Sequence, residues 1–283
     1  MYKKNVSIIK STGDIVPFYP DKLKRSLQRS GASELQAENI IEQIQGSLYE
    51  GITTKKIYQQ AYRLLRGSSR PLAAKYKLKR AITELGPTGF PFEKYIAAIF
   101  EKQGYHVETG VIAEGHCVKH EIDVIAKRNN EHLMIECKFH HSPGTVCDVK
   151  IPLYIHSRFL DVREGLTKLA GHNNIQHQAW VVTNTRFTSD AIQYGICAGL
   201  NLLGWDYPAD KSLNKMIDES GLYPLTCLTS LSANEKQVLL NNRIVLCKEI
   251  YNNERVLPQA GIITARINTI LAEVRQLCKT QDH

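Results

Sequence analysis

This chain of 283 residues lacks several patterns that mark well-known classes of protein. No apolar run approaches the roughly 20 residues that a membrane helix needs, and residues 1–5 start no apolar signal region, so we expect a cytoplasmic protein without membrane contact. The pattern G-x-x-x-x-G-K-[ST] is missing, so nucleotide hydrolysis is not expected. The seven cysteines include no C-x-x-C pair and predict no zinc site. Cys137 and Cys197 lie in apolar runs typical of buried thiols.

Residues 91–283 have no excess of basic residues, although a simple DNA-binding surface would need one. Residues 1–90 hold 16 Lys and Arg against 7 Asp and Glu, a balance of +9, whereas residues 91–283 hold 20 against 21, a balance of −1. The excess of positive charge is therefore N-terminal. This segment is expected to attract anions of its own, either nucleotides or nucleic acid.

Two short segments in the middle of the chain alternate polar and apolar residues. Residues 121–127 read EIDVIAK and residues 132–138 read HLMIECK, with turn-forming residues between them, which predicts a β-hairpin. Asp123 and Glu136 then lie on neighbouring strands, and Lys138 shares a face with Glu136 because side chains two apart point the same way. Carboxylate oxygens suit Mg²⁺. The hairpin therefore predicts a metal-dependent nuclease site.

The alternative for this hairpin is a solvated pair of charges on an exposed face, since a bare E-x-K occurs by chance in most proteins. The apolar neighbours Ile122, Val124 and Ile135 argue against it. They indicate central strands, in which polar side chains need a reason to be present. We therefore favour the functional interpretation.

Residues 89–95 (GFPFEKY), 121–124 (EIDV) and 136–138 (ECK) resemble the PD-(D/E)xK superfamily, in particular the Mrr-like restriction endonucleases. The resemblance covers roughly residues 89–208 and implies an α/β fold, a restriction-endonuclease-like mixed sheet flanked by helices. The sequence patterns predict the same order of elements. These are a helix from residue 92 to 104, strands near 105–112, 120–127 and 132–139, a helix near 153–170, a strand at 179–183, a helix near 189–199 and a strand near 202–205.

The resemblance also implies roles for individual residues. Asp123, Glu136 and the backbone carbonyl of Cys137 would hold Mg²⁺, for which Mn²⁺ can substitute, and Lys138 would position the attacking water. Glu93 would be an additional acid on the first helix. The alternative for Glu93 is a first-turn glutamate that complements the helix dipole, and both roles are compatible.

The first 88 residues resemble the ATP-cone, a regulatory nucleotide-binding domain that is mostly helical. The resemblance rests on residues 8–13 (IIKSTG), on Lys22 and on Thr54, and it implies ATP or dATP bound near Lys10, Ser11, Lys22 and Thr54. Ser11 stands where the family usually has arginine, which removes a cation from the phosphate site. The alternative is a protein-interaction module that binds no nucleotide. We expect strands at 6–10 and 15–16, helices from about 19, 33 and 53, and a fourth helix near 70–85.

We expect residues 212–283 to form a small helical domain, and their pattern resembles helix-hairpin-helix motifs. Gly261 fits the tight turn from which such motifs offer backbone N–H groups to a DNA phosphate. Segments 225–231, 238–244 and 260–267 carry the pattern, and Arg243 and Arg266 are the expected phosphate contacts. A dimerisation domain without DNA contact is an equal alternative.

The sequence thus predicts three domains, at residues 1–88, 89–211 and 212–283. The predicted function is a Mg²⁺-dependent endodeoxyribonuclease regulated by a purine nucleoside triphosphate. DNA and a second copy of the chain are the expected partners. The alternative is a catalytically inactive, nucleotide-responsive DNA-binding regulator, against which the complete set of two acids and a lysine argues.

Overall fold

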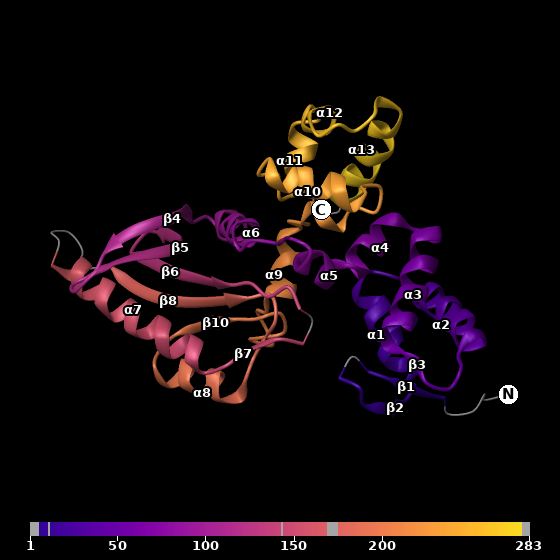
Figure 1. Ribbon diagram of the computed structural model, residues 1–283, viewed down its shortest axis with the longest axis horizontal. Coiled ribbons are helices and arrows are strands. Elements are labelled where there is room, and N and C mark those ends of the chain that lie inside the picture. The colour runs from indigo at the N-terminus through magenta and orange to yellow at the C-terminus, as the bar shows by residue number, and fades with distance from the viewer. Residues whose placement is uncertain (1–5, 11, 143, 169–174, 279–283) are drawn as a thin grey trace.

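The computed structural model describes residues 6–10, 12–142, 144–168 and 175–278. Its ribbon shows a sheet with flanking helices at the left, the N-terminal helices at the right and the C-terminal helices above them (Figure 1). None of the described helices is long and apolar enough to cross a membrane.

The N-terminal part is a small three-stranded sheet covered by helices. Its elements are β1 (Ser7–Ile9), β2 (Ile15–Pro17), α1 (Pro20–Arg29), α2 (Glu34–Ser47), β3 (Ile52–Thr53), α3 (Thr54–Ser68), α4 (Arg70–Tyr76) and α5 (Leu78–Thr83). Strand β1 pairs antiparallel with β2 and parallel with β3. Helix α2 begins with a capping box between Ser33 and Gln36, which satisfies free N–H groups of its first turn. These helices bury their own apolar core, centred on residues such as Leu27, Ile44 and Leu65.

The single helix expected near residues 70–85 is two helices, and this expectation was wrong. The chain bends at Lys77, between α4 and α5. The apolar residues on the two sides serve different cores. Ala73 packs in the N-terminal core, whereas Leu78, Ile82 and Leu85 join the core around the larger sheet. One straight helix could not present both faces.

The central part is a five-stranded mixed sheet between helices, which confirms the predicted fold class. Its elements are α6 (Phe90–Lys102), β4 (His106–Glu114), β5 (Lys119–Arg128), β6 (Glu131–Lys138), β7 (Val146–Cys147), α7 (Lys150–Thr167), β8 (Gln176–Thr183), β9 (Arg186–Phe187), α8 (Ser189–Cys197) and β10 (Asn201–Leu203). The strand order is β10-β8-β6-β5-β4. Strands β4, β5 and β6 are antiparallel neighbours, and β6, β8 and β10 run parallel.

Helix α6 covers one face of this sheet, and α7 and α8 cover the other. Phe92 and Phe100 of α6 are fully buried against residues such as Val124 and Ile135. On the opposite face, Val162 of α7 packs on Met134. Cys137 is buried as expected, but Cys197 is exposed because it lies at the solvent-facing end of α8. The expectation of a buried Cys197 was therefore wrong.

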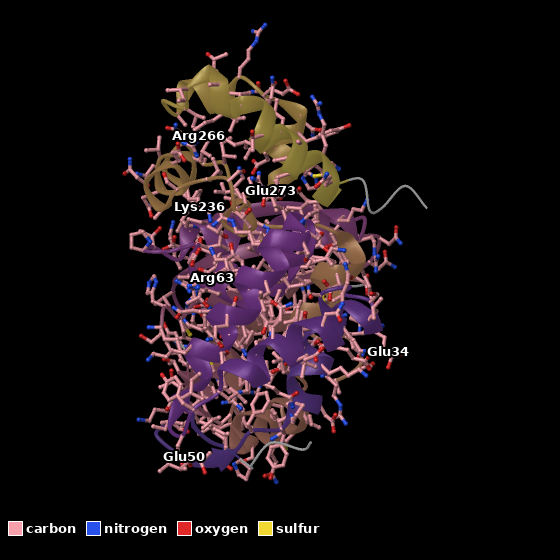
Figure 2. The ribbon with its side chains drawn as sticks, turned by 90° about the vertical axis from the view of Figure 1, so that its right-hand side faces the viewer. Glu34, Glu50, Arg63, Lys236, Arg266 and Glu273 are labelled. Carbon is pink, nitrogen blue, oxygen red and sulfur yellow. The ribbon has the colours of Figure 1, made fainter. Side chains whose placement is uncertain are left out.

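The C-terminal part consists of short helices that share a core with α6. They are α9 (Leu213–Ser220), the 3₁₀ helix η1 (Leu225–Cys227), α10 (Ala233–Asn241), α11 (Cys247–Asn252), α12 (Val256–Gln259) and α13 (Thr264–Cys278). The Tyr95 hydroxyl of α6 donates to the Leu222 carbonyl at 2.6 Å, and one continuous core joins α5, α6 and the C-terminal helices. Figure 2 shows these helices, which carry Arg266 and Glu273, stacked above the N-terminal helices.

Candidate nuclease site

Strands β5 and β6 separate at the point where the predicted acids lie. Their pairing runs from Arg128↔Glu131 to Val124↔Ile135 and ends there. The next N–H that faces β5, that of Cys137, donates to Asp123 Oδ2 at 2.7 Å. A side chain thus replaces a carbonyl of the ladder. Because the N–H and C=O of one strand residue point to the same neighbour, the Cys137 carbonyl also faces this opening.

Three of the predicted residues meet at the opening. Glu136 accepts from Lys138 Nζ through Oε1 at 2.6 Å, and Asp123 lies beside them on β5. Burial, followed by the nearby Glu136 carboxylate, raises the pKa of Asp123 to about 6. The cause is unfavourable desolvation and repulsion between like charges, which a cation at this place would relieve.

Glu93 approaches the same place from α6. It lies in the first turn of that helix, and its carboxylate folds back toward Gly89, where an added Cβ would lie 3.0 Å from Glu93 Oε1. Burial is the main cause that raises the pKa of Glu93 to about 7, and the carboxylates of Asp123, Glu121 and Glu136 add to it. The structure therefore brings Glu93, Asp123, Glu136 and Lys138 together.

Sequence reasoning missed Arg158, which completes this cluster. Its Nη1 donates to Glu136 Oε2 at 2.8 Å, and its Nη2 donates to the Glu121 carbonyl. A signal was present in the sequence. Arg158 follows Ile155 by three residues and precedes Val162 by four, so it falls within the apolar stripe of α7. A charged residue on a buried helix face needs a partner.

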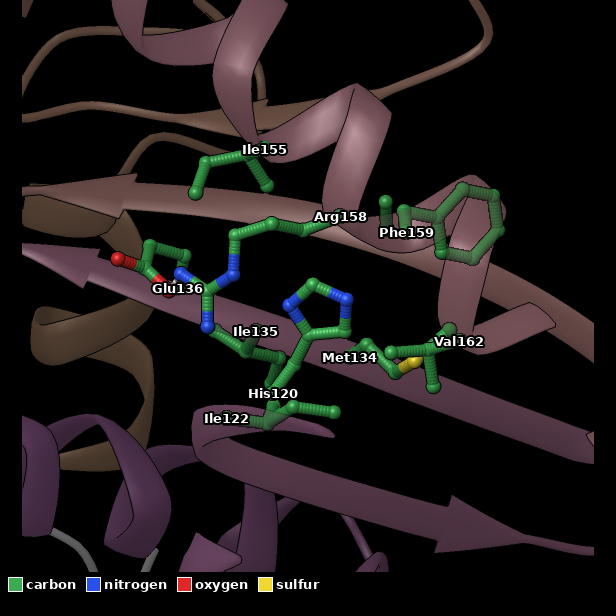
Figure 3. Close-up of a pocket in the computed structure, with 10 residues that line it drawn as sticks. His120, Ile122, Met134, Ile135, Glu136, Ile155, Arg158, Phe159 and Val162 are labelled. Carbon is green, nitrogen blue, oxygen red and sulfur yellow. Dashed lines mark hydrogen bonds and ion pairs between the residues drawn. The ribbon is translucent and has the colours of Figure 1, made fainter. Parts of the chain in front are cut away.

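A small pocket lies between α7 and the sheet next to these charges. Figure 3 shows Arg158 reaching from α7 across to Glu136, with the His120 ring beside it. His120 Nε2 is 2.7 Å from Asp161 Oδ2, and Asp161 also accepts from the Cys117 N–H at 2.7 Å. The other lining residues are apolar, and of the polar ones Arg158 pairs with Glu136.

The oxygens at the opening suit Mg²⁺ or Mn²⁺. Two carboxylates, Asp123 and Glu136, and the carbonyl of Cys137 are hard donors. Across the described ranges, no three Asp, Glu, His or Cys side chains form a metal-binding group by themselves. Magnesium does not need such a cage, because it is commonly held by one or two carboxylates, waters and substrate phosphates. The Cys137 thiol takes no part, since it is buried on the other face and burial raises its pKa well above the ordinary value.

The residues predicted to bind nucleotide lie at one end of the N-terminal sheet. Ile9 of β1 pairs with Thr53 of β3, so Lys10 and Thr54 follow directly from two adjacent strands. Lys10 lies 3.6 Å from Asp14. Lys22 is in the first turn of α1, with Nζ 4.8 Å from the centre of the Tyr19 ring. Ser11 lies outside the described residues.

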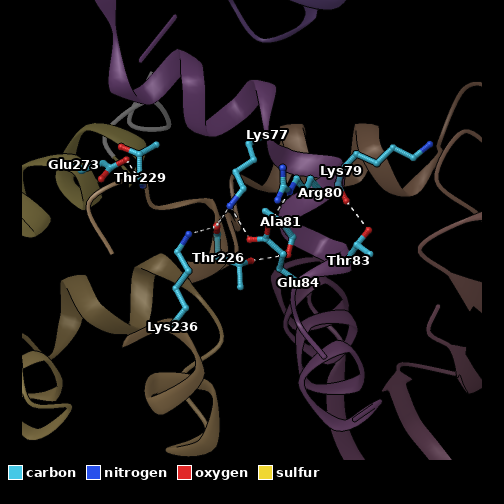
Figure 4. A network of polar contacts seen from close by, with 10 residues as sticks. All are labelled: Lys77, Lys79, Arg80, Ala81, Thr83, Glu84, Thr226, Thr229, Lys236 and Glu273. Atoms are coloured by element: carbon cyan, nitrogen blue, oxygen red, sulfur yellow. Dashed lines mark hydrogen bonds and ion pairs between the residues drawn. The ribbon is translucent and has the colours of Figure 1, made fainter. Parts of the chain in front are cut away.

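The N-terminal helices join the rest of the chain through a polar network at α5. Lys77 donates to Glu84 at 2.6 Å, and both Lys77 and the buried Lys236 donate to the Thr226 carbonyl, at 3.3 and 2.8 Å (Figure 4). The segment after α5 also touches the nuclease site region, since an added Cβ on Gly86 would lie 2.2 Å from His141 Cε1. His141 is three residues beyond Lys138.

The residues expected to grip DNA in the tail have other partners. The Arg266 guanidinium pairs with Glu235, and its Nη2 donates to the Ser230 carbonyl at 2.6 Å. Arg243 has a positive φ of 62° and lies over the Phe90 ring at 5.4 Å. Arg266 therefore has a structural partner, Glu235, within the C-terminal part. Gly261 does adopt the left-handed conformation that a tight turn requires, with φ of 79°.

Three family profiles match consecutive parts of the chain. The ATP cone domain matches residues 6–84, the restriction endonuclease family of the Mrr type matches residues 87–152, and the C-terminal domain of AF1548-like proteins matches residues 223–278. These matches confirm both resemblances on which the domain organisation was predicted. They also give the C-terminal part a family of its own.

Known relatives cover much of the chain. An uncharacterised protein of Archaeoglobus fulgidus is 34% identical over 184 residues, which are 64% of this chain and 99% of that protein. The crystal structure of AF1548, described as a protein of unknown function, is 31% identical, with a TM-score of 0.55, over 69% of this chain and all of the other. The MspJI restriction endonuclease in complex with a 27-mer oligonucleotide is 11% identical over 70% of this chain and 39% of that one; its TM-score of 0.29 carries no weight. The chain belongs to the AF1548-like family and adds to it an N-terminal ATP cone.

Proposed function

We propose that this protein is a metal-dependent endodeoxyribonuclease whose activity responds to a purine nucleoside triphosphate. The observation that carries the proposal is the convergence of Asp123, Glu136 and Lys138 at the place where β5 and β6 separate. A match to Mrr-type restriction endonucleases over residues 87–152 supports it.

Each residue has a defined task in the proposed hydrolysis. Asp123, Glu136 and the Cys137 carbonyl would hold Mg²⁺, which would supply positive charge to the scissile phosphate. Lys138 orients the attacking water from its position beside Glu136. Glu93, in the first turn of α6, assists as an additional acid beside that water.

The balance of the reaction is simple. The water oxygen forms a bond to phosphorus, and the bond from phosphorus to the leaving oxygen breaks. The leaving oxygen gains a proton, and one of the two DNA ends carries a phosphate. The residues at the opening provide charge and position, which are the main requirements of phosphoryl transfer.

Nucleotide regulation is proposed from the N-terminal part. Lys10 and Thr54 lie at adjacent strand ends, and the family profile of the ATP cone domain covers residues 6–84. The link to the site runs through α5 and Gly86, whose backbone lies against His141. A nucleotide changes cleavage only if it binds two states of the protein with different affinity.

The test is cleavage of supercoiled plasmid with Mg²⁺, run without nucleotide, with ATP and with dATP. We expect nicked or linear product that requires Mg²⁺ and changes in rate with at least one nucleotide. DNA binding without cleavage under all of these conditions would refute the nuclease and favour the catalytically inactive regulator. Equal rates with and without nucleotide would refute only the regulatory part.

A further inference from the structure

Arg158 bridges the two strands at the place where they separate. Its guanidinium contacts the Glu121 carbonyl on β5 and the Glu136 carboxylate on β6, the latter at 2.8 Å. The planar fork of arginine suits two acceptors at once. The Arg158 side chain is only 17% exposed, so this bridge is part of the packed structure.

A second residue of α7 fixes the position of this bridge. Asp161, three residues after Arg158, accepts from the backbone N–H groups of Cys117 and Val118 at 2.7 and 3.3 Å and lies 2.7 Å from His120. Asp161 and Arg158 therefore hold the same stretch of chain, at the start of β5. Because residues three apart lie on one side of a helix, both contacts form only when α7 is seated on the sheet.

Both oxygens of Glu136 are engaged by cations. Lys138 Nζ lies 2.6 Å from Oε1, and Arg158 Nη1 lies 2.8 Å from Oε2. A guanidinium cannot lose its proton in a protein, so its positive charge opposes a divalent cation that approaches Glu136. Arginine also binds phosphate oxygens through two parallel hydrogen bonds. A DNA phosphate at the opening is therefore a competing partner for Arg158.

We infer that Arg158 is a positioning residue that links metal binding to DNA binding, an inference that rests on the proposed function. In the DNA-free protein Arg158 holds Glu136 and weakens the binding of a divalent cation. A DNA phosphate then binds the guanidinium, and Oε2 of Glu136 is free to bind the metal. The site therefore binds its metal tightly only when its substrate is present.

Metal binding without DNA is the first arm of the test. Free Mn²⁺ is measured by electron paramagnetic resonance as the full-length protein is titrated. Arg158→Gln should bind Mn²⁺ on the order of tenfold more tightly than the natural protein, because a like charge has been removed. Arg158→Lys keeps the charge and should show no such gain. Arg163→Gln is the matched control on the exposed side of α7, where Arg163 lies over the Phe159 ring.

The outcomes of this arm separate the two proposals. If Arg158→Gln binds Mn²⁺ no more tightly than the natural protein, or if Arg158→Lys gains as much, the role of Arg158 is refuted. If Asp123→Asn and Glu136→Gln leave Mn²⁺ binding unchanged, the metal site itself is wrong and the proposed function fails with it. Tryptophan fluorescence in EDTA verifies that each variant is folded.

The second arm of the test measures DNA affinity and relies on the reciprocity of coupled binding. If DNA strengthens metal binding, the metal must strengthen DNA binding by the same factor. The affinity for a labelled duplex is measured by fluorescence anisotropy with and without Mn²⁺, before cleavage begins. Mn²⁺ should increase this affinity on the order of tenfold for the natural protein and for Arg163→Gln. The gain should be much smaller for Arg158→Gln. An equal gain in Arg158→Gln would overturn the inference.

Discussion

The repulsion around Asp123 predicts that the metal-free nuclease domain becomes less stable as the pH rises from 4 to 7. Burial and the Glu136 carboxylate raise the pKa of Asp123 from 3.8 to about 6. Between these values the folded protein binds a proton that the unfolded chain has released. The free energy of unfolding therefore falls with rising pH across this window. The stability that the Asp123 proton contributes is complete below about pH 4 and is lost above about pH 6.

The size of this effect follows from the shift. One pKa unit corresponds to about 1.4 kcal/mol, so a shift of roughly two units gives an upper value of about 3 kcal/mol. Asp123 is only partly buried. Screening by solvent reduces the expected effect to about 1–2 kcal/mol. Asp123→Asn, which has no titrating proton, should lack this loss.

The assay is urea unfolding in EDTA at pH 4, 5, 6 and 7. Both tryptophans, Trp180 and Trp205, lie in or beside the nuclease sheet, so their fluorescence follows this part of the chain. The stability of Asp123→Asn relative to the natural protein should increase by about 1–2 kcal/mol from pH 4 to pH 7. Asp210→Asn removes an exposed carboxylate and is the control. A difference that stays constant with pH, or that decreases, would refute the electrostatic description of the site.

Three further predictions concern the other parts of the molecule. Lys138→Ala should slow Mg²⁺-dependent cleavage by about a hundredfold or more while Mn²⁺ still binds, as single-turnover kinetics and metal titration will show; loss of metal binding would contradict the role given to this lysine. Lys10→Ala should weaken ATP or dATP binding about tenfold in calorimetry of the full chain, whereas Arg29→Ala at the far end of α1 should not; equal heats for both variants would refute the phosphate contact. Glu273→Ala should destabilise the C-terminal helices by about 2–4 kcal/mol, measured by circular dichroism in urea, because the part-buried N–H groups of Thr229 and Ser230 lose the buried carboxylate that they contact at 2.7 and 2.9 Å. A cost below about 1 kcal/mol would show that water replaces the carboxylate there.

The sheet and its hairpin could be predicted because their signals are local. Alternation in residues 121–127 and 132–138 reflects one strand each, and the turn between them is short. Strands β5 and β6 were therefore predicted to within a few residues. The same locality placed Asp123 beside Glu136. Their catalytic roles stay a prediction.

The contacts of Arg158 and the division of α4 from α5 could not be predicted from local patterns alone. Arg158 meets Glu136 across 22 positions of sequence, and only its place in an apolar stripe marked it. The bend at Lys77 arises because Ala73 and Leu78 pack in different cores, which no local pattern records. In the tail, residues 225–231 were expected to carry part of the helix-hairpin-helix pattern. Residues 225–227 form the 3₁₀ helix η1, and the loop after it is held by the buried Glu273 carboxylate.

The most direct test of the central claim compares plasmid cleavage by the natural protein, Glu136→Gln and Asp210→Asn under single-turnover conditions. The account predicts that the natural protein and Asp210→Asn convert supercoiled plasmid at the same rate with Mg²⁺ and are inactive in EDTA. Glu136→Gln should be folded, should bind DNA and should leave the plasmid intact. Cleavage by Glu136→Gln at the natural rate, or cleavage by any of the three proteins in EDTA, would contradict the assignment of the site between β5 and β6.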